Sequence, residues 1–302
     1  MIAAGLDIGG TKIVTQLFDG NWQPASHRRV PTPAQYDELI ACIADEIARA
    51  CENDPGIPVG VGMAGLINPQ TGLALTANLP ATGRPLLADI CTAAGRQVHL
   101  LNDCRAHTVS EAQFGAARGE LCVVGLFLGT GVGGGIAIGG RLMQSPNALS
   151  GEFGHTAAPA DIVAAHGLPI VTCGCGRIGC IETLIAGAGL TRLGECFIGE
   201  TLSPEAIVER RNSDAAAEKT WETWCLLVGE LVLSTVVAVD PDMVVLGGGL
   251  SGIDGVVEGV DRAVRSRQLP GFRTPRLAVA DGEADSAARG AAYHAWSVQH
   301  HA

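Results

Sequence analysis

The sequence predicts an α/β protein built from two related α/β units. Residues 2–17 form a strand, a glycine turn and a strand, and residues 121–138 repeat that pattern. Strand-like apolar runs also alternate with helical spacing, as in the helix expected at 36–51 and the strand at 59–63. With 302 residues, 47% of them hydrophobic, the chain is long enough for two domains. We expect a small domain of 1–117 plus 287–302, a larger one of 118–286, and a cleft between them.

Composition narrows the classes of partner. The net charge of −11, from 20 basic and 31 acidic residues, argues against binding to nucleic acid or anionic lipid. The sequence contains no uninterrupted apolar run of the roughly 18 residues that a membrane helix needs, and Met1 leads directly into a strand-like segment. Most of the ten cysteines are scattered, as reduced core residues would be. We therefore expect a cytoplasmic protein that acts on small molecules, without nucleic acid or membrane as partner.

The first glycine turn lies in GLDIGGTK, which begins at Gly5. Backbone amides in such a turn can bind an anion, and Thr11 and Lys12 add a hydroxyl and a cation. Asp7, on the preceding strand, is suited to hold a hydrated Mg2+ beside phosphate. A Gly-Gly hairpin taken alone is equally an ordinary turn. The candidate nucleotide-binding residues here are Gly5, Leu6, Asp7, Ile8, Gly9, Gly10, Thr11 and Lys12.

The second turn, LGTGVGGG from Leu128, holds more glycines than a hairpin requires. Their absence of side chains would let backbone N–H groups approach phosphate closely. Neither turn has the spacing and context of a P-loop or a Rossmann motif, which excludes both. A third glycine turn, at 247–249, either admits an adenine and its ribose or serves tight packing. The candidate ligands are Gly129, Thr130, Gly131, Val132, Gly133, Gly134, Gly135 and Gly248.

Four residues are candidates for binding the substrate or for acting in catalysis. Asn78 lies in a turn-rich loop, where Asn is usually a turn former, although its amide can also donate to and accept from a sugar hydroxyl. The strand at 59–63 opens on Gly65, a further candidate contact. A strand at 98–101 ends in Asn102 and Asp103, at the end of a strand where α/β sheets bind ligands. Asp103 is the best general-base candidate, with helix capping as the alternative.

Three cysteines crowd together in CGCGRIGCIE, between glycines that free the backbone to fold around one point. Structural zinc takes four Cys or His ligands in a tetrahedron, and His155 upstream can complete the set with Cys173, Cys175 and Cys180. The alternative is three reduced thiols on a glycine-rich turn.

Two carboxylates flank the predicted metal centre. Glu152 precedes His155, and Glu182 follows the last cysteine. A metal would hold both in fixed positions, where they could accept hydrogen bonds from substrate hydroxyls. The alternative is that each glutamate is an ordinary solvated surface group.

Taken together, the motifs resemble the ROK family of bacterial sugar kinases and sugar-responsive repressors. They run from one end of the chain to the other, and the CxCGxxGCxE pattern is specific to that family. The resemblance implies the actin-like ATPase (ribonuclease H-like) fold, two duplicated α/β domains with ATP and sugar in the cleft between them. The motifs are GLDIGGTK at Gly5, LNDCRA at Leu101, LGTGVGGG at Leu128, GEFGH at Gly151, CGCGRIGCIE at Cys173 and VVLGGG at Val244.

The resemblance also implies roles for particular residues. Asp103 would be the catalytic base, ATP and Mg2+ the cofactors, and a homodimer the assembly. A structural Zn2+ would be held by His155, Cys173, Cys175 and Cys180. The sugar pocket would be lined by Asn78, Asn102, Glu152, His155 and Glu182.

Within the family, three stretches are similar to members that phosphorylate the 6-hydroxyl of N-acetyl-D-glucosamine: RVPTP at Arg29, TANLPATGRPLLADI at Thr76 and the spacer from Ala158 to the cysteines. Many glucose-directed members carry Gly-Trp where this chain has Ala81-Thr82. N-acetylmannosamine, glucose and fructose remain alternative substrates. A non-catalytic sugar-sensing regulator is a further alternative, although the family's repressors carry an N-terminal DNA-binding extension and here the first strand begins at Ile2.

Overall fold

The computed structural model describes residues 1–282 and 286–300. By its internal contacts the chain divides into two compact units. Unit 1 comprises Met1–Gly119, Gly135–Ser150 and Asp281–Ala302, and unit 2 comprises Glu120–Gly134 and Gly151–Ala280. The division expected from the sequence, 1–117 plus 287–302 and 118–286, stays a prediction, and positions 283–285 next to its second boundary lie outside the described residues.

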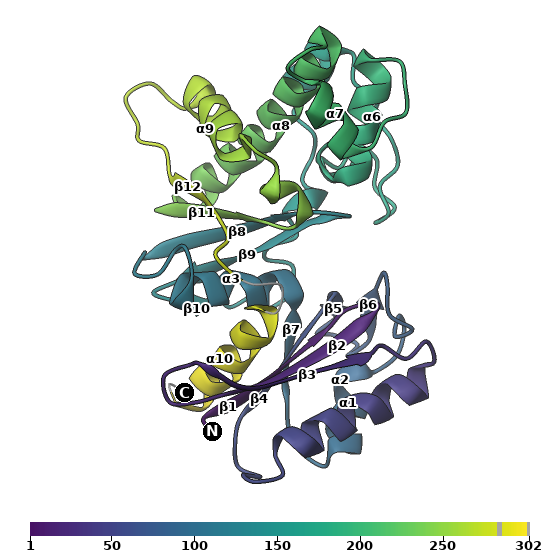
Figure 1. Cartoon of the computed structure of the whole chain (residues 1–302), viewed down its shortest axis with the longest axis vertical. Coiled ribbons are helices and arrows are strands. Elements are labelled where there is room, and N and C mark those ends of the chain that lie inside the picture. Colours follow the sequence, from purple (N-terminus) through teal and green to yellow (C-terminus); the bar gives the residue numbers. More distant parts are fainter. Residues whose placement is uncertain (283–285, 301–302) are drawn as a thin grey trace. The chain divides into compact units, whose positions relative to one another are not determined.

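Unit 1 is built on a five-stranded sheet (Figure 1). Its central strand β1 pairs antiparallel with β2, and β2 pairs with β3, so the first three strands form a meander. On its other side β1 pairs parallel with β4, and β4 with β7. The strand order is β3-β2-β1-β4-β7, and the bounds are β1 Ala3–Ile8, β2 Lys12–Phe18, β3 Pro24–Pro31, β4 Val59–Met63 and β7 His99–Asn102.

Helices cover both faces of this first sheet. The main core lies between β1, β4 and the pair α1 and α2, where aliphatic residues such as Leu6, Leu39 and Ile43 are buried. On the other face lie α3 and α10 (Figure 1). A small hairpin, β5 with β6, follows β4. The bounds are α1 Tyr36–Ala50, β5 Gly65–Ile67, β6 Ala74–Thr76, α2 Leu86–Ala94, α3 Asp103–Phe114 and α10 Ser286–His300.

The last helix packs against the sheet backbone to backbone. A Cβ added to Gly5 on β1 would overlap the carbonyl oxygen of Ala288, and one added to Gly60 on β4 would overlap that of Ala291. On the helix side, Gly290 lies equally close to the carbonyl of Ala106 in α3. The small residues of α10 therefore set the distance between helix and sheet.

A second five-stranded sheet repeats the topology of the first. Strand β8 lies between β9 and β11. It pairs parallel with β11, which pairs parallel with β12, while β9 pairs antiparallel with β10. The order β10-β9-β8-β11-β12 corresponds strand for strand to that of the first sheet, which confirms the predicted duplication. The bounds are β8 Cys122–Leu128, β9 Val132–Ile138, β10 Arg141–Leu142, β11 Met243–Gly247 and β12 Arg276–Val279.

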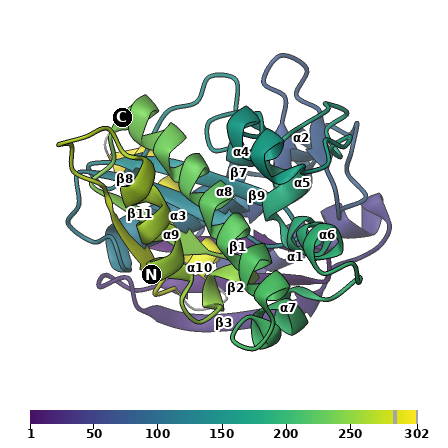
Figure 2. The ribbon, with the colours of Figure 1, turned by 90° about the horizontal axis from the view of Figure 1, so that it is seen from above.

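In unit 2 the helices precede and follow β11. The longest described helix, α8, is capped at its N-terminus by Asp214, whose carboxylate accepts the amide of Ala216 at 2.8 Å. By length and composition alone α8 is apolar enough to cross a membrane, but it packs against α6, α7 and α9 as a core helix does (Figure 2). The bounds are η1 Phe153–His155, α4 Ala160–His166, α5 Glu182–Ile185, α6 Gly187–Phe197, α7 Pro204–Arg210, α8 Ala215–Val239, η2 Gly249–Gly252 and α9 Val256–Arg267.

Candidate active site and metal centre

The first glycine turn joins β1 to β2. The amide of Gly9 donates to the carbonyl of Lys12 at 3.0 Å, which closes the hairpin. Thr32, just after β3, holds the turn from behind, because its hydroxyl donates to the carbonyl of Gly9 at 2.6 Å and its amide to that of Thr11 at 3.1 Å. Asp7 lies on β1, opposite Val14 in the register. The carbonyl groups of Gly9, Thr11 and Lys12 thus each accept a hydrogen bond that holds the turn in shape.

The predicted sugar loop lies directly beside this turn. A Cβ on Gly10 would approach the Cβ of Asn78 to 2.9 Å, so only glycine permits this packing. Asn78 itself is exposed. Two threonines hold its loop: the hydroxyl of Thr82 accepts from the amide of Thr76 at 3.0 Å and donates to its carbonyl at 2.7 Å, and the Thr76 hydroxyl donates to Leu79. Unit 1 thus brings a candidate phosphate turn and a candidate sugar ligand together.

Asn102 and Asp103 stand where β7 passes into α3. Asn102 caps the helix, since its Oδ1 accepts the amide of Arg105 at 3.3 Å, and its Nδ2 donates to the carbonyl of Gly65 at 3.3 Å. Asp103 is the first helical residue, half-buried, and its Oδ1 accepts the amide of Cys104 at 2.8 Å. The capping role considered for Asp103 is thus filled by Asn102. Gly65 has a φ of 154° and lies too close to Leu75 for any side chain.

The second glycine turn, between β8 and β9, belongs to unit 2. The amide of Gly129 donates to the carbonyl of Gly131 at 3.0 Å, and the carbonyl of Gly129 accepts from Gly187 at 2.9 Å. At the other end of the turn, the amide of Val132 donates to Glu182 Oε2 at 2.8 Å. Thr130 and Gly131 are exposed at the tip. The contact of Gly187 with this turn was not predicted from the sequence, because no residue near Gly187 in the sequence indicates a hydrogen bond to Gly129.

Several candidate nucleotide-binding glycines have a packing reason of their own. A Cβ on Gly134 would overlap the carbonyl of Gly125 and come 2.7 Å from the Phe153 ring. One on Gly135 would come 2.8 Å from the hydroxyl of Thr108. Gly248, at φ 82°, lies against the carbonyl of Leu128. Their contact with a nucleotide, like that of Gly133, stays a prediction.

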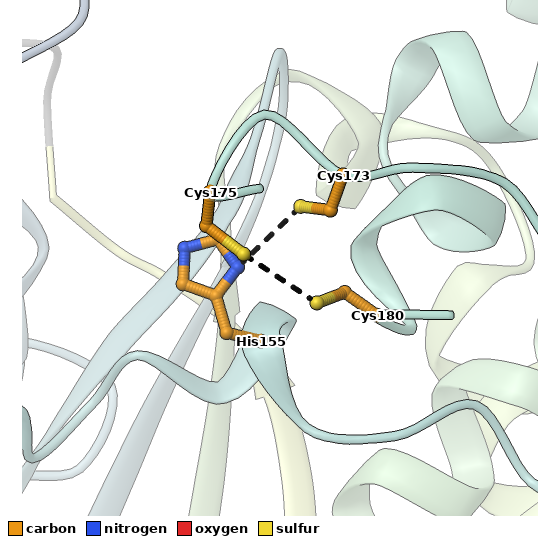
Figure 3. Close-up of side chains that lie close together, drawn as sticks. All are labelled: His155, Cys173, Cys175 and Cys180. Carbon is orange, nitrogen blue, oxygen red and sulfur yellow. Dashed lines mark hydrogen bonds between the residues drawn. The ribbon is translucent and has the colours of Figure 1, made fainter. Parts of the chain in front are cut away.

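The cysteine cluster and His155 converge on one point (Figure 3). One ligand atom from each of His155, Cys173, Cys175 and Cys180 lies within 4.8 Å of the others. The sulfurs of Cys175 and Cys180 are 3.7 Å apart, and Cys173 Sγ is 3.7 Å from His155 Nδ1. Thiolates bound to one tetrahedral zinc at about 2.3 Å are about 3.8 Å apart. The donor set and its spacing therefore fit a zinc ion.

Local backbone geometry creates this convergence. Gly176 and Gly179 have φ of 85° and 77°, values that favour glycine. The amide of Cys173 donates to the carbonyl of Arg177 at 2.8 Å, and the Arg177 guanidinium donates to the carbonyl of His155 at 2.8 Å. The second bond ties the cysteine turn to the segment that carries the histidine.

The three thiols of the cluster differ in acidity. Burial raises the pKa of Cys173 to about 12 and raises the pKa of Cys180, whereas a backbone hydrogen bond from Arg177 lowers the pKa of the exposed Cys175. Without a cation the buried sulfurs therefore hold their protons. A divalent ion would displace those protons, as coordinated thiols are deprotonated.

The two flanking carboxylates lie against the cluster. Glu152 Oε2 is 4.0 Å from His155 Nε2, the ring nitrogen opposite the one that faces Cys173. Glu182 Oε1 accepts from Cys173 Sγ at 3.5 Å while its Oε2 holds Val132. The imidazole can thus serve a metal through Nδ1 and an acceptor or substrate through Nε2.

Sequence reasoning also missed two buried charges on α3. The Arg105 guanidinium donates to the carbonyl of Ser150 at 2.7 Å and to that of Ala148. The carboxylate of Glu111, fully buried, accepts the amides of Ala116 at 3.0 Å and of Gly282 at 2.8 Å. Apart from Ala116, these partners lie 43 to 171 residues away along the chain, so no local pattern signals them. Both residues brace the helix that begins at Asp103.

Comparison with known proteins identifies the family of the chain. The ROK family model matches residues 3–297. The chain belongs to the ROK family. It is 38% identical over 95% of its length to the N-acetylgalactosamine kinase AgaK of Shewanella (94% of that protein), and 37% identical over 95% to an N-acetyl-D-glucosamine kinase of Pectobacterium atrosepticum (97% of that protein).

Solved structures of the family show the same fold. The ROK hexokinase of Thermus thermophilus superposes with a TM-score of 0.86 at 33% identity, covering 99% of both chains. A ROK family glucokinase of Streptomyces griseus, solved with glucose and AMPPNP, gives 0.75 at 26% identity over 98% of this chain and 99% of the other. This ROK protein therefore has the actin-like ATPase fold, and its two five-stranded sheets are the duplicated element.

Proposed function

We propose that this ROK protein is an ATP-dependent sugar kinase that phosphorylates the 6-hydroxyl of N-acetyl-D-glucosamine. The observation that carries the proposal is the arrangement at the start of α3, where Asn102 caps the helix and leaves Asp103 to serve as a base. The family, and two relatives named as kinases of N-acetylated hexosamines, support it.

The proposed mechanism follows from the demands of phosphoryl transfer. The transition state is loose, so the protein mainly positions groups and neutralises charge. Asp103 accepts the proton of the 6-hydroxyl as its oxygen forms a bond to the γ-phosphorus and the bond from that phosphorus to the departing ADP breaks. The amides of the two glycine turns would hold the phosphates, and Asp7 would hold an Mg2+ ion, whose charge would offset theirs. Asn78, Asn102, Glu152, His155 and Glu182, with Gly65 behind Asn102, are proposed to orient the sugar.

The substrate is tested by a panel of sugars with ATP and Mg2+, measured as ADP release. N-acetylglucosamine should give the highest kcat/KM, compared with N-acetylmannosamine, glucose and fructose. N-acetylgalactosamine belongs in the panel because the relative AgaK is named for it. Absence of ADP release with every sugar would favour the non-catalytic sensor.

The base is tested by Asp103→Asn. General-base catalysis contributes about 100- to 10,000-fold, so kcat should fall within or beyond that range while calorimetry shows sugar binding close to wild type. Asp45→Asn, at an exposed position of α1, is the matched control and should keep wild-type turnover. Substantial turnover by Asp103→Asn would mean that another group is the base.

We further propose that His155, Cys173, Cys175 and Cys180 hold a structural zinc. Four protein ligands leave no open position for a catalytic water. Elemental analysis should find one zinc per chain, and Cys175→Ser should lower the zinc content. A homodimer in the cytoplasm, binding neither nucleic acid nor membrane, completes the proposal.

A further inference from the structure

Glu182 stands where the cysteine cluster meets the second glycine turn. Its Oε2 accepts the amide of Val132 at 2.8 Å. Glu182 also follows Cys180 by two residues, and the next residue, Thr183, donates its amide and its hydroxyl to the carbonyl of Cys180 at 3.1 and 2.8 Å. The carboxylate is thus bound to the turn, while the backbone that carries it is held to a predicted metal ligand. A hydrogen bond to an ionised acceptor is roughly twice as strong as one between neutral groups. Glu182 therefore connects the turn to the cluster.

Two glycines leave room for the Glu182 carboxylate. A Cβ on Gly131 would lie 3.1 Å from Glu182 Oε2, and so would one on Gly154. Gly154 belongs to η1, directly before His155, so the glycine in GEFGH lies against the same oxygen. Two positions without side chains thus border the carboxylate, one in the turn and one beside a predicted metal ligand.

The segment that begins at Glu182 holds the turn at its other end as well. Helix α5 starts at Glu182, and the amide of Ala186 donates to the carbonyl of Glu182 at 3.0 Å. The next residue, Gly187, donates its amide to the carbonyl of Gly129 at 2.9 Å. Residues 182–187 therefore fix both Gly129 and Val132, the two ends of the turn, and leave the exposed tip between them.

We propose that Glu182 is a positioning residue for the phosphates of the nucleotide, through which an ordered metal centre fixes the turn at 129–132. The inference rests on the proposed function, in which this turn binds phosphate, and it adds a second role to a residue proposed as a sugar ligand. A pure sugar ligand would affect sugar affinity alone. A positioning residue also sets nucleotide affinity when no sugar is present.

The test measures binding of AMPPNP with Mg2+ by calorimetry, without sugar, in the zinc-loaded protein. Loss of one hydrogen bond to a charged group weakens binding by about tenfold or more, so Glu182→Ala should raise the nucleotide Kd about tenfold. Glu182→Gln keeps an oxygen that can accept from Val132, and its Kd should stay within about threefold of wild type. Equal nucleotide affinity in Glu182→Ala and wild type would overturn the inference.

A matched variant separates this role from sugar binding. Glu152 flanks the same cluster, and its Oε2 lies 4.0 Å from His155 Nε2. Glu152→Ala should therefore weaken sugar binding while the sugar-free nucleotide Kd stays near that of wild type. If Glu152→Ala raised the nucleotide Kd as much as Glu182→Ala does, the effect would be a general loosening of the region and the inference would fail.

Removal of the metal tests the connection itself. Chelation, checked by elemental analysis, should raise the nucleotide Kd of wild type about tenfold but leave that of Glu182→Ala unchanged, because the link is already broken. Equal effects of chelation in both proteins would contradict the proposed link. Circular dichroism confirms that each variant is folded. If wild type phosphorylates a sugar and these shifts are absent, only this inference fails, whereas an inactive wild type would contradict the proposed function.

Discussion

Thr82 illustrates how one hydroxyl can shape a candidate binding loop. It accepts the amide of Thr76 and donates to the carbonyl of Thr76, so it closes the loop that carries Asn78. Leu79 and Ala81 in the same loop are buried, which anchors it from below, while Asn78 stays exposed. The loop is therefore held in one shape before any sugar binds. Preorganisation of this kind lowers the entropy cost of binding.

Replacement of Thr82 by valine should release this loop. Valine has nearly the same shape but cannot form the two hydrogen bonds, each worth about 1 kcal/mol, so the KM for sugar should rise about tenfold. The melting temperature should change little, because Thr82 is exposed. Thr82→Ser keeps the hydroxyl and is the control. A wild-type KM in Thr82→Val would show that the loop does not position the sugar ligand.

At the scale of elements, α10 depends on glycines in the strands beneath it. Gly5 on β1 and Gly60 on β4 allow the carbonyls of the helix to approach the sheet. The apolar face of the helix is made of alanines, including Ala287, Ala288 and Ala291, all fully buried. Because the contact is between backbones, neither side has a flexible side chain that could move aside.

A methyl group at Gly60 should therefore be costly. We expect Gly60→Ala to lower the free energy of unfolding by about 3 kcal/mol, measured by urea denaturation, because overpacked cores have few ways to relax. Gly20→Ala is the matched control, since a Cβ there meets no atom within 4 Å. A change below about 1 kcal/mol for Gly60→Ala would mean that α10 can shift on the sheet.

At the scale of the whole molecule, the stability of the chain should depend on pH through a half-buried histidine. Burial, aided by nearby His99, lowers the pKa of His294 in α10 to about 4, from an ordinary value of 6.5. The two rings meet edge to face with centroids 6.3 Å apart. Burial also lowers the pKa of His99. The folded chain thus keeps His294 neutral at pH values where the unfolded chain protonates it.

The sign follows from proton linkage. Between pH 6.5 and 4 the unfolded state binds a proton that the folded state does not, so this group favours unfolding progressively as the pH falls through that range. A difference of this size corresponds to about 3 kcal/mol at most, lost between those pH values and constant above 6.5. His294→Gln should flatten this slope in urea denaturation, whereas His27→Gln, at an exposed position on β3, should keep it. An unchanged slope in His294→Gln would contradict the assignment.

The fold class, the family and the clustering of His155 with three cysteines could all be predicted from the sequence alone. Short, contiguous sequence patterns predict these features. The patterns are a strand-turn-strand unit that occurs twice, three cysteines between glycines, and motifs of a few residues each. A local pattern suffices because strand pairing across a tight turn, and the bend of a glycine-rich segment, depend on neighbouring residues alone.

The contacts of individual side chains could be seen only in the folded chain. Asn102, not Asp103, caps α3, Gly134 and Gly248 are required by packing, and Glu182 bonds to Val132. Each outcome depends on distances between groups that the chain brings together from far apart, or on which of two adjacent side chains faces the helix end. Spacing along the sequence does not encode such distances, because they are set by how whole elements pack.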